Sequence, residues 1–124
     1  MITGYVNAKL EAVIPLHLRI PAEQAHELDA VIDTGFSAYL TLPPVLVAAL
    51  GLQSEATGQL LLADGSEIKT DLCTVTVEWD GQVRQVLVDV FDTEILVGMA
   101  LLRGYDLNAR VVSGGAVTLT RIPG

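Results

Sequence analysis

The chain has 124 residues, of which 51% are apolar, and its net charge is −8 at pH 7. This length predicts a single domain over residues 1–124. The negative charge argues against nucleic acid as a partner, because phosphate contacts need clustered Lys and Arg side chains. Apolar content this high indicates either a large core or an apolar surface that a second copy covers, so we expect an oligomer.

Membrane and secretory signals are absent from the sequence pattern. No uncharged apolar run approaches the roughly 18 residues that a transmembrane helix needs, so no membrane partner is expected. The N-terminus, Met1 to Leu10, lacks a basic start followed by an apolar core. A single cysteine, Cys73, excludes an intrachain disulfide and a cysteine metal cluster, and its pattern predicts a buried strand residue. We expect a cytoplasmic protein with no metal and no cofactor.

The first half of the chain predicts two strands and a helix. Val13–Ile20 alternates as a strand, with Pro15 marking an edge or a bend. Leu28–Ile32 is a short apolar run, typical of a strand buried on both faces. Leu42-Pro43-Pro44 opens a helix through Leu50, because proline suits a first turn and Gly51 suits the stop.

The second half of the chain predicts three hairpins separated by a short strand and a helix. The hairpins cover Gly58–Ile68 around Asp64-Gly65, Thr70–Phe91 around Asp80-Gly81, and Tyr105–Ile122 across Ser113-Gly114-Gly115. In the second hairpin we expect one face to carry Val75, Val77 and Trp79, and one face of the return strand to carry Val86, Val88 and Val90. Between the second and third hairpins, Ile95–Val97 predicts a buried strand, and Gly98–Arg103 predicts a helix capped by Gly104. So many short strands indicate a mostly-β barrel or sandwich with one or two short helices.

The feature most suggestive of chemistry is Asp33-Thr34-Gly35, which ends an apolar strand and precedes Phe36. A carboxylate at the end of a buried strand is costly unless hydrogen bonds or a proton stabilise it, so Asp33 is either a structural cap or a chemical group. Gly35 gives the backbone room to turn, and its N–H can hold the carboxylate. A structural aspartate in a tight turn is the alternative interpretation.

Three elements stand in a meaningful order: the Asp33-Thr34-Gly35 turn, the hairpin at Asp64-Gly65, and Ile95-Leu96-Val97-Gly98 running into Leu101-Leu102. This order resembles the retropepsin-like aspartic proteases, which carry an Asp-Thr-Gly turn, a hairpin flap, and an apolar strand ending in glycine before a helix. The resemblance covers roughly residues 10–122. Asp-Thr-Gly-Phe and Gly-Met-Ala-Leu-Leu-Arg-Gly are most similar to a small prokaryotic branch. The implied fold is a retropepsin-like barrel.

The resemblance implies an aspartic endopeptidase that cleaves polypeptides, with Asp33, Thr34 and Gly35 as its catalytic turn. Two close aspartates share one proton, so that one activates a water while the other protonates the carbonyl. No second Asp-Thr-Gly or Asp-Ser-Gly exists in the chain, so two chains must each supply Asp33 in a homodimer. The dimer sheet is expected at or near Ala116–Ile122. The residues expected to bind substrate are Phe36, Ser37, Ala63, Asp64, Gly65 and Ser66.

Two departures from the resembled family leave a second hypothesis open. Ser37 and Met99 stand where viral members carry an acidic and a basic residue that pair near the interface. The hairpin tip, Ala63 to Glu67, is acidic and polar, whereas the viral flap is glycine-rich and apolar. The alternative is therefore a catalytically weak or inactive dimeric module that binds peptides on the same fold. A barrel that carries an apolar ligand is a third hypothesis, and it draws on composition alone.

Overall fold

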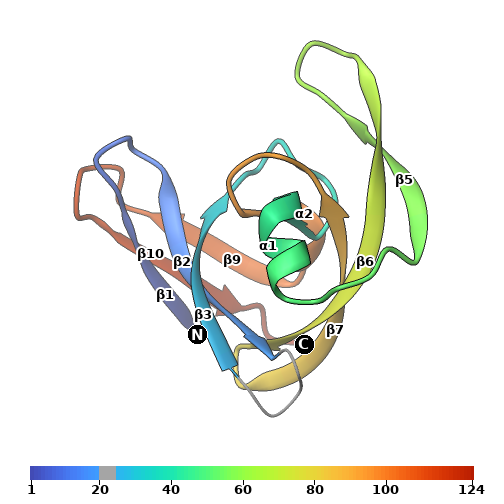
Figure 1. The fold of residues 1–124 in the computed structure, drawn as a ribbon. Helices are drawn as coiled ribbons and strands as arrows, with labels where there is room; N and C mark the ends of the chain where they lie inside the picture. The colour runs from blue at the N-terminus through green and yellow to red at the C-terminus, as the bar shows by residue number, and fades with distance from the viewer. Residues whose placement is uncertain (20–24) are drawn as a thin grey trace.

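The computed structural model describes residues 1–19 and 25–124, which form ten strands and two short helices (Figure 1). The predicted mostly-β architecture with two short helices is confirmed. In chain order the elements are β1 (Ile2–Val6), β2 (Ala12–Arg19), β3 (Ala25–Ile32), β4 (Leu40–Leu42), α1 (Pro44–Ala49), β5 (Ala56–Leu61), β6 (Glu67–Trp79), β7 (Gln82–Val90), β8 (Leu96–Val97), α2 (Met99–Leu102), β9 (Tyr105–Ala109) and β10 (Ala116–Arg121). Neither helix is long and apolar enough to cross a membrane; this finding covers the described residues only.

The strands form one sheet that closes on itself. Its order is β5-β6-β7-β4-β8-β3-β2-β1-β10-β9, and an additional pairing joins β6 to β2 through His17↔Glu78 and Leu18↔Val77. That pairing closes the strands between β6 and β2 into a barrel. β1, β10 and β9 continue the sheet away from it on one side, and β5 lies beyond it on the other (Figure 1).

Pro15 lies where β2 changes partners. One edge of β2 pairs with β3 from Val13 to Arg19, and the other edge pairs with β1 at Ala12 and Val13 and with β6 at His17 and Leu18. Pro15 falls between these two pairings, where its missing N–H breaks no ladder bond. The sequence predicted an edge or a bend at Pro15, and the structure places Pro15 at an unpaired stretch of one edge of β2. The last residue of the predicted strand, Ile20, lies outside the described residues.

Several strand predictions need correction. β3 starts at Ala25 and is not buried on both faces, because Asp29 is exposed and Val31 is only half-buried. β1 and β4 were not predicted at all. Both are short, and they exist because distant partners pair with them: β10 with β1, and β7 with β4. β9 ends at Ala109, not at Val112, because residues 112–115 turn the chain.

The predicted turns and helix stops follow local backbone chemistry. Asp80 and Gly81 both have positive φ, at 52° and 81°, as a two-residue type I′ hairpin requires. In the β5–β6 hairpin only Gly65 has a positive φ, at 87°. There the Leu62 N–H donates to the Ser66 carbonyl at 2.8 Å, which closes a three-residue loop. β6 is one continuous strand, Glu67–Trp79, shared by the β5–β6 and β6–β7 hairpins, although the sequence pattern predicted a separate strand for each hairpin. α1 begins at Pro44, and Gly51 follows it with φ of 70°.

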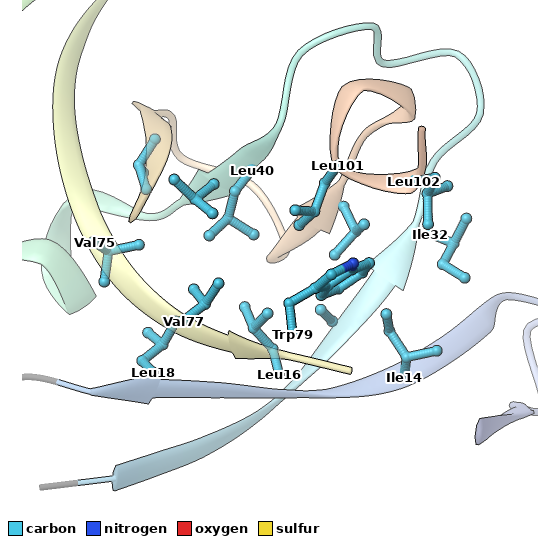
Figure 2. Packing of buried hydrophobic residues seen from close by; sticks show 14 of the residues in the cluster. Ile14, Leu16, Leu18, Ile32, Leu40, Val75, Val77, Trp79, Leu101 and Leu102 are labelled. Atoms are coloured by element: carbon cyan, nitrogen blue, oxygen red, sulfur yellow. The ribbon is translucent and has the colours of Figure 1, made fainter. Parts of the chain in front are cut away.

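The core lies inside the barrel, where the two predicted faces of the β6–β7 hairpin meet β2, β3 and α2 (Figure 2). Val75, Val77 and Trp79 are buried as predicted, and so are Val86 and Val88 on the return strand. Leu101 and Leu102 of α2 close one side of the cluster. Cys73 is buried as predicted, and burial raises the pKa of its thiol.

Asp80 joins the β6–β7 turn to both ends of the described chain. Its carboxylate accepts hydrogen bonds from the Met1 ammonium at 2.6 Å and from the Tyr105 hydroxyl at 3.0 Å, and Arg121 lies 3.7 Å away. The Met1 contact, followed by the Tyr105 hydrogen bond, lowers the pKa of Asp80 below its usual value of 3.8. A lowered pKa stabilises the folded chain above that usual value, and this contribution disappears as the pH falls through the folded-state pKa.

Asp80→Asn is therefore expected to lower Tm by a few degrees at neutral pH and to leave it unchanged in strong acid. Asparagine tolerates the positive φ of the turn, so the backbone is preserved. Thermal unfolding followed across pH measures the difference. Asp106→Asn, at an exposed carboxylate of β9, is the control with the same charge change. An Asp80→Asn deficit that stays constant down to the most acidic pH would contradict the assignment.

Candidate active site

Asp33 stands at the carboxyl ends of two neighbouring parallel strands. β3 pairs with β8 in parallel, with Val31 opposite Leu96 and Ile32 opposite Val97. The Asp33 N–H continues this ladder by donating to the Val97 carbonyl at 2.9 Å. The aspartate is therefore fixed by the sheet and is half-buried.

The loop after Asp33 folds back onto its carboxylate. The Gly35 N–H donates to Asp33 Oδ1 at 2.9 Å, as expected from the sequence, and the Phe36 N–H donates to the Asp33 carbonyl at 3.1 Å. Within the described residues, Oδ2 of Asp33 accepts no hydrogen bond. One carboxylate oxygen is thus anchored while the other is available to a water or a second acid.

The start of α2 locks this loop through the backbone. Three N–H groups, those of Gly98, Met99 and Ala100, donate to carbonyls of the 36–39 segment at 2.8 to 3.1 Å. A Cβ at Gly98 would lie 2.1 Å from the Ala38 carbonyl oxygen, so only glycine allows this approach. These backbone bonds join the loop to the helix at Met99, one of the two positions where the resembled viral proteins carry a side-chain ion pair and this chain does not.

Asp33 borders two cavities. The first, of about 460 Å³, lies beneath the β5–β6 hairpin and is lined by Asp33, Gly35, Phe36, Thr41, Leu60, Leu61, Leu62, Ala63, Phe91 and Leu96. The second, of about 530 Å³, lies on the Thr34 side of Asp33 and includes Leu10 and Leu107 in its lining. The carboxylate therefore sits where the two cavities meet, with the hairpin above only the first.

The residues expected to bind substrate divide into two sets. Phe36 and Ala63 line the first cavity together with Asp33. Ser37 is exposed and lines neither cavity. The tip residues Asp64, Gly65 and Ser66 also stay outside the first cavity.

The tip is built as a turn whose carboxylate is already engaged. Asp64 accepts hydrogen bonds from the Ser66 hydroxyl at 2.6 Å and from the Ser66 N–H at 2.9 Å, and these bonds lower its pKa. An aspartate with both bonds inside its own loop shapes the turn, in agreement with the hairpin predicted around Asp64-Gly65.

The apolar roof of the first cavity was not foreseen. It is formed by Leu60, Leu61 and Leu62 of the hairpin, which Figure 1 shows standing away from the barrel. Leu61 remains 68% exposed. Three consecutive leucines break the alternation of a hairpin strand, and this was the signal that could have identified them.

Thr41 supports the cavity wall from below. It is fully buried, its hydroxyl donates to the Glu94 carbonyl at 3.1 Å, and it accepts the Leu96 N–H at 3.0 Å. It therefore joins β4 to the segment that leads into β8. Among residues 1–19 and 25–124, no three His, Cys, Asp or Glu side chains are grouped as a metal site would need.

The second cavity combines exposed leucines with polar residues, among them Glu11, Thr93 and Glu94. Leu10, Leu107, Val111 and Val112 are exposed, with Val111 at 62% and Val112 at 56%. β10, the strand expected at a dimer sheet, already pairs with β1 on one edge and β9 on the other. It cannot add a strand from another chain, and the free edge next to it belongs to β9.

Comparison with known proteins gives a likeness at the level of the fold. No family model matches the sequence, and no curated protein matches it. The chain is similar to the crystal structure of a retropepsin-like aspartic protease from Rickettsia conorii, with a TM-score of 0.57 and 16% identity over 98% of this chain and 90% of that one. The fold is therefore retropepsin-like, which confirms the fold that the three motifs implied.

Proposed function

We propose that this protein is an aspartic endopeptidase whose active site is assembled from two copies of the chain. The observation that carries the proposal is the position of Asp33, whose carboxylate has one anchored and one available oxygen between a hairpin-covered cavity and an open one. The retropepsin-like fold and the protease named in the similar structure support the same reading.

A second Asp33 supplies what one carboxylate lacks. Peptide hydrolysis without a metal or a covalent nucleophile needs a base to activate water and an acid to protonate the carbonyl oxygen. Two carboxylates at close range share one proton, because both cannot ionise together, and so the pair provides both functions. In the proposed dimer the deprotonated Asp33 takes a proton from water while the water oxygen attacks the carbonyl carbon of the peptide bond. The protonated Asp33 then gives its proton to the carbonyl oxygen, which forms a tetrahedral diol. As the diol collapses, the C–N bond breaks, the leaving nitrogen takes the proton that the first Asp33 had accepted from water, and a diol hydroxyl returns its proton to the other Asp33.

The open cavity beside Thr34 is the proposed entry point of the second chain. Exposed Leu10 and Leu107 border it, and Val111 and Val112, in the loop between β9 and β10, are also exposed apolar residues. A surface of this kind is typical of a protein interface. Thr34, which lines the same cavity, is the residue proposed to contact the other copy of the loop.

The first cavity is the proposed substrate channel. A polypeptide there would lie between Asp33 below and Leu60–Leu62 above, with Phe36 and Ala63 at its sides. Because this lining is apolar, we propose that the cleft prefers apolar side chains next to the bond that is cut. Asp64, Gly65 and Ser66 would act through the shape of the hairpin and would reach substrate only when the hairpin closes.

The test is incubation of the protein with unfolded polypeptides at mildly acidic pH, beside Asp33→Asn. Cleavage by the wild-type chain and none by the variant supports the proposal. Equal cleavage by both would overturn it. Capture of peptides without turnover at every pH would instead favour a dimeric peptide-binding module, to which the polar hairpin tip and the missing ion pair at Ser37 and Met99 point.

A further inference from the structure

We infer that the barrel end opposite Asp33 holds a binding site for an anionic oxygen group, a carboxylate or a phosphate. The site is a cavity of about 290 Å³ lined by Trp79, Gln82, Arg84, Arg103, Gly104, Tyr105, Arg121 and Ile122. The β6–β7 turn, which joins the lining residues Trp79 and Gln82, lies at the bottom of Figure 1, whereas the β5–β6 hairpin tip lies at the top.

The cavity gathers positive charge in a chain that has little of it. The chain has seven Lys and Arg residues against fifteen Asp and Glu. Three of the seven, Arg84, Arg103 and Arg121, line this one cavity, and no acidic residue lines it. Arg121 is partly engaged by Asp80, at 3.7 Å. Arg84 and Arg103 form no ion pair within the described residues, so their guanidinium groups are free to bind an anion.

The register of the β6–β7 hairpin places one of these arginines on the core side of the sheet. Trp79 is opposite Gln82, and Val77 is opposite Arg84. Opposite residues of an antiparallel pair share a face, so Arg84 and Gln82 share the face of buried Val77 and Trp79. Further along β7 the same face carries buried Val86 and Val88. On this face of β7, the buried valines are followed by the polar residues Gln82 and Arg84 at the open end of the barrel. A strand with only a structural role would not require polar residues at these core-facing positions.

The wall of the cavity includes a buried tryptophan. Trp79 is 3% exposed, and its indole Nε1 has no hydrogen-bond partner among the described residues. Figure 2 shows the indole within the core, near Leu101 of α2, the helix that Arg103 follows. Tyr105 packs edge-on against Trp79, with ring centroids 6.0 Å apart.

The size and donor chemistry define the ligand class. A volume near 290 Å³ lies at the lower end of the range for ligand pockets, which suits one small anion or one acidic side chain. Guanidinium groups pair with carboxylate and phosphate oxygens in forked geometry, so both anions fit. The overall negative charge of the chain opposes anion approach, so the attraction is local and is expected to weaken as salt is added.

The single tryptophan makes the site measurable, because Trp79 is its wall. Inorganic phosphate and succinate are titrated separately while Trp79 fluorescence is recorded, and sodium chloride at matched ionic strength is the reference. We expect a saturable change in fluorescence with phosphate, succinate or both. The anion that produces the change shows whether the site binds phosphate groups, carboxylate groups or both. The indole N–H resonance in NMR spectra should shift in the same titration. No saturable change, or an equal change with chloride, would overturn the inference.

Arginine variants distinguish binding in this cavity from a general effect of the protein's positive charge. Arg84→Gln and Arg103→Gln are each expected to weaken binding about tenfold, as loss of one charge-assisted contact implies. Both side chains are exposed, so the fold should survive, which thermal unfolding checks. Arg110→Gln, at the β9–β10 turn, removes the same charge outside the cavity and should leave binding unchanged. Equal weakening by all three variants would show a diffuse charge effect and contradict the site.

Discussion

Replacing Asp33 by asparagine in every chain is expected to reduce peptide cleavage by about 10²- to 10⁴-fold, the contribution of a positioned acid–base group. Asparagine keeps the shape of the side chain and can still accept the Gly35 N–H, so the loop should remain folded. It can neither take a proton from water nor share one with its partner. The measurement is the rate of cleavage of an unfolded polypeptide at mildly acidic pH, with thermal unfolding as the folding control.

Mixing intact and Asp33→Asn chains tests whether the site is shared. If each active site needs two intact copies and chains pair at random, an equal mixture should keep about a quarter of the activity of the same total of wild-type chain. A site contained in one chain would keep about half. Asp71→Asn, at an exposed carboxylate of β6 outside both cavities, is the matched control, and mixing it with intact chains should leave the activity unchanged. An equal mixture that retains half of the activity would contradict the two-chain site.

Among substitutions that add a single methyl group near the site, Gly98→Ala is expected to destabilise the protein most. Its φ of −94° suits any residue, so the effect comes from space alone. The new Cβ would lie 2.1 Å from the Ala38 carbonyl oxygen and 2.6 Å from the Phe36 ring, and the backbone contact cannot rotate away. We expect a loss of about 3 kcal/mol of stability, at the upper end for overpacking.

Gly98→Ala should also lower the cleavage rate of the molecules that remain folded. Displacing the loop moves Asp33, and a shift near 1 Å costs about 10²-fold in rate. Two glycines serve as comparisons in unfolding and cleavage assays. Gly4→Ala brings a Cβ to 1.9 Å from the Val13 carbonyl oxygen away from Asp33, and Gly58→Ala contacts only the side chain of Leu72. Activity that falls no more in folded Gly98→Ala than in folded Gly4→Ala would contradict the positioning role.

The sequence predicted the parts of this protein whose causes are local. The type I′ turn at Asp80-Gly81 follows from the backbone angles those residues tolerate, and the stop at Gly51 follows in the same way. The buried face of Val75, Val77 and Trp79 follows from a two-residue period. The Gly35 bond to Asp33 follows because two residues are enough to turn the backbone onto a carboxylate.

Tertiary structure decided which distant segments meet, because strand pairing depends on partners that no local pattern names. β4 is three residues long and exists through β7 and β8, and β1 exists through β2 and β10. Leu60, Leu61 and Leu62 became a cavity roof only when the hairpin stood over Asp33. Likewise, Arg84, Arg103 and Arg121 are scattered along the chain, and only closure of the barrel brings them to one cavity. The aspartate and its turn were determined by the sequence alone, and the surroundings that give them chemistry were determined by the fold.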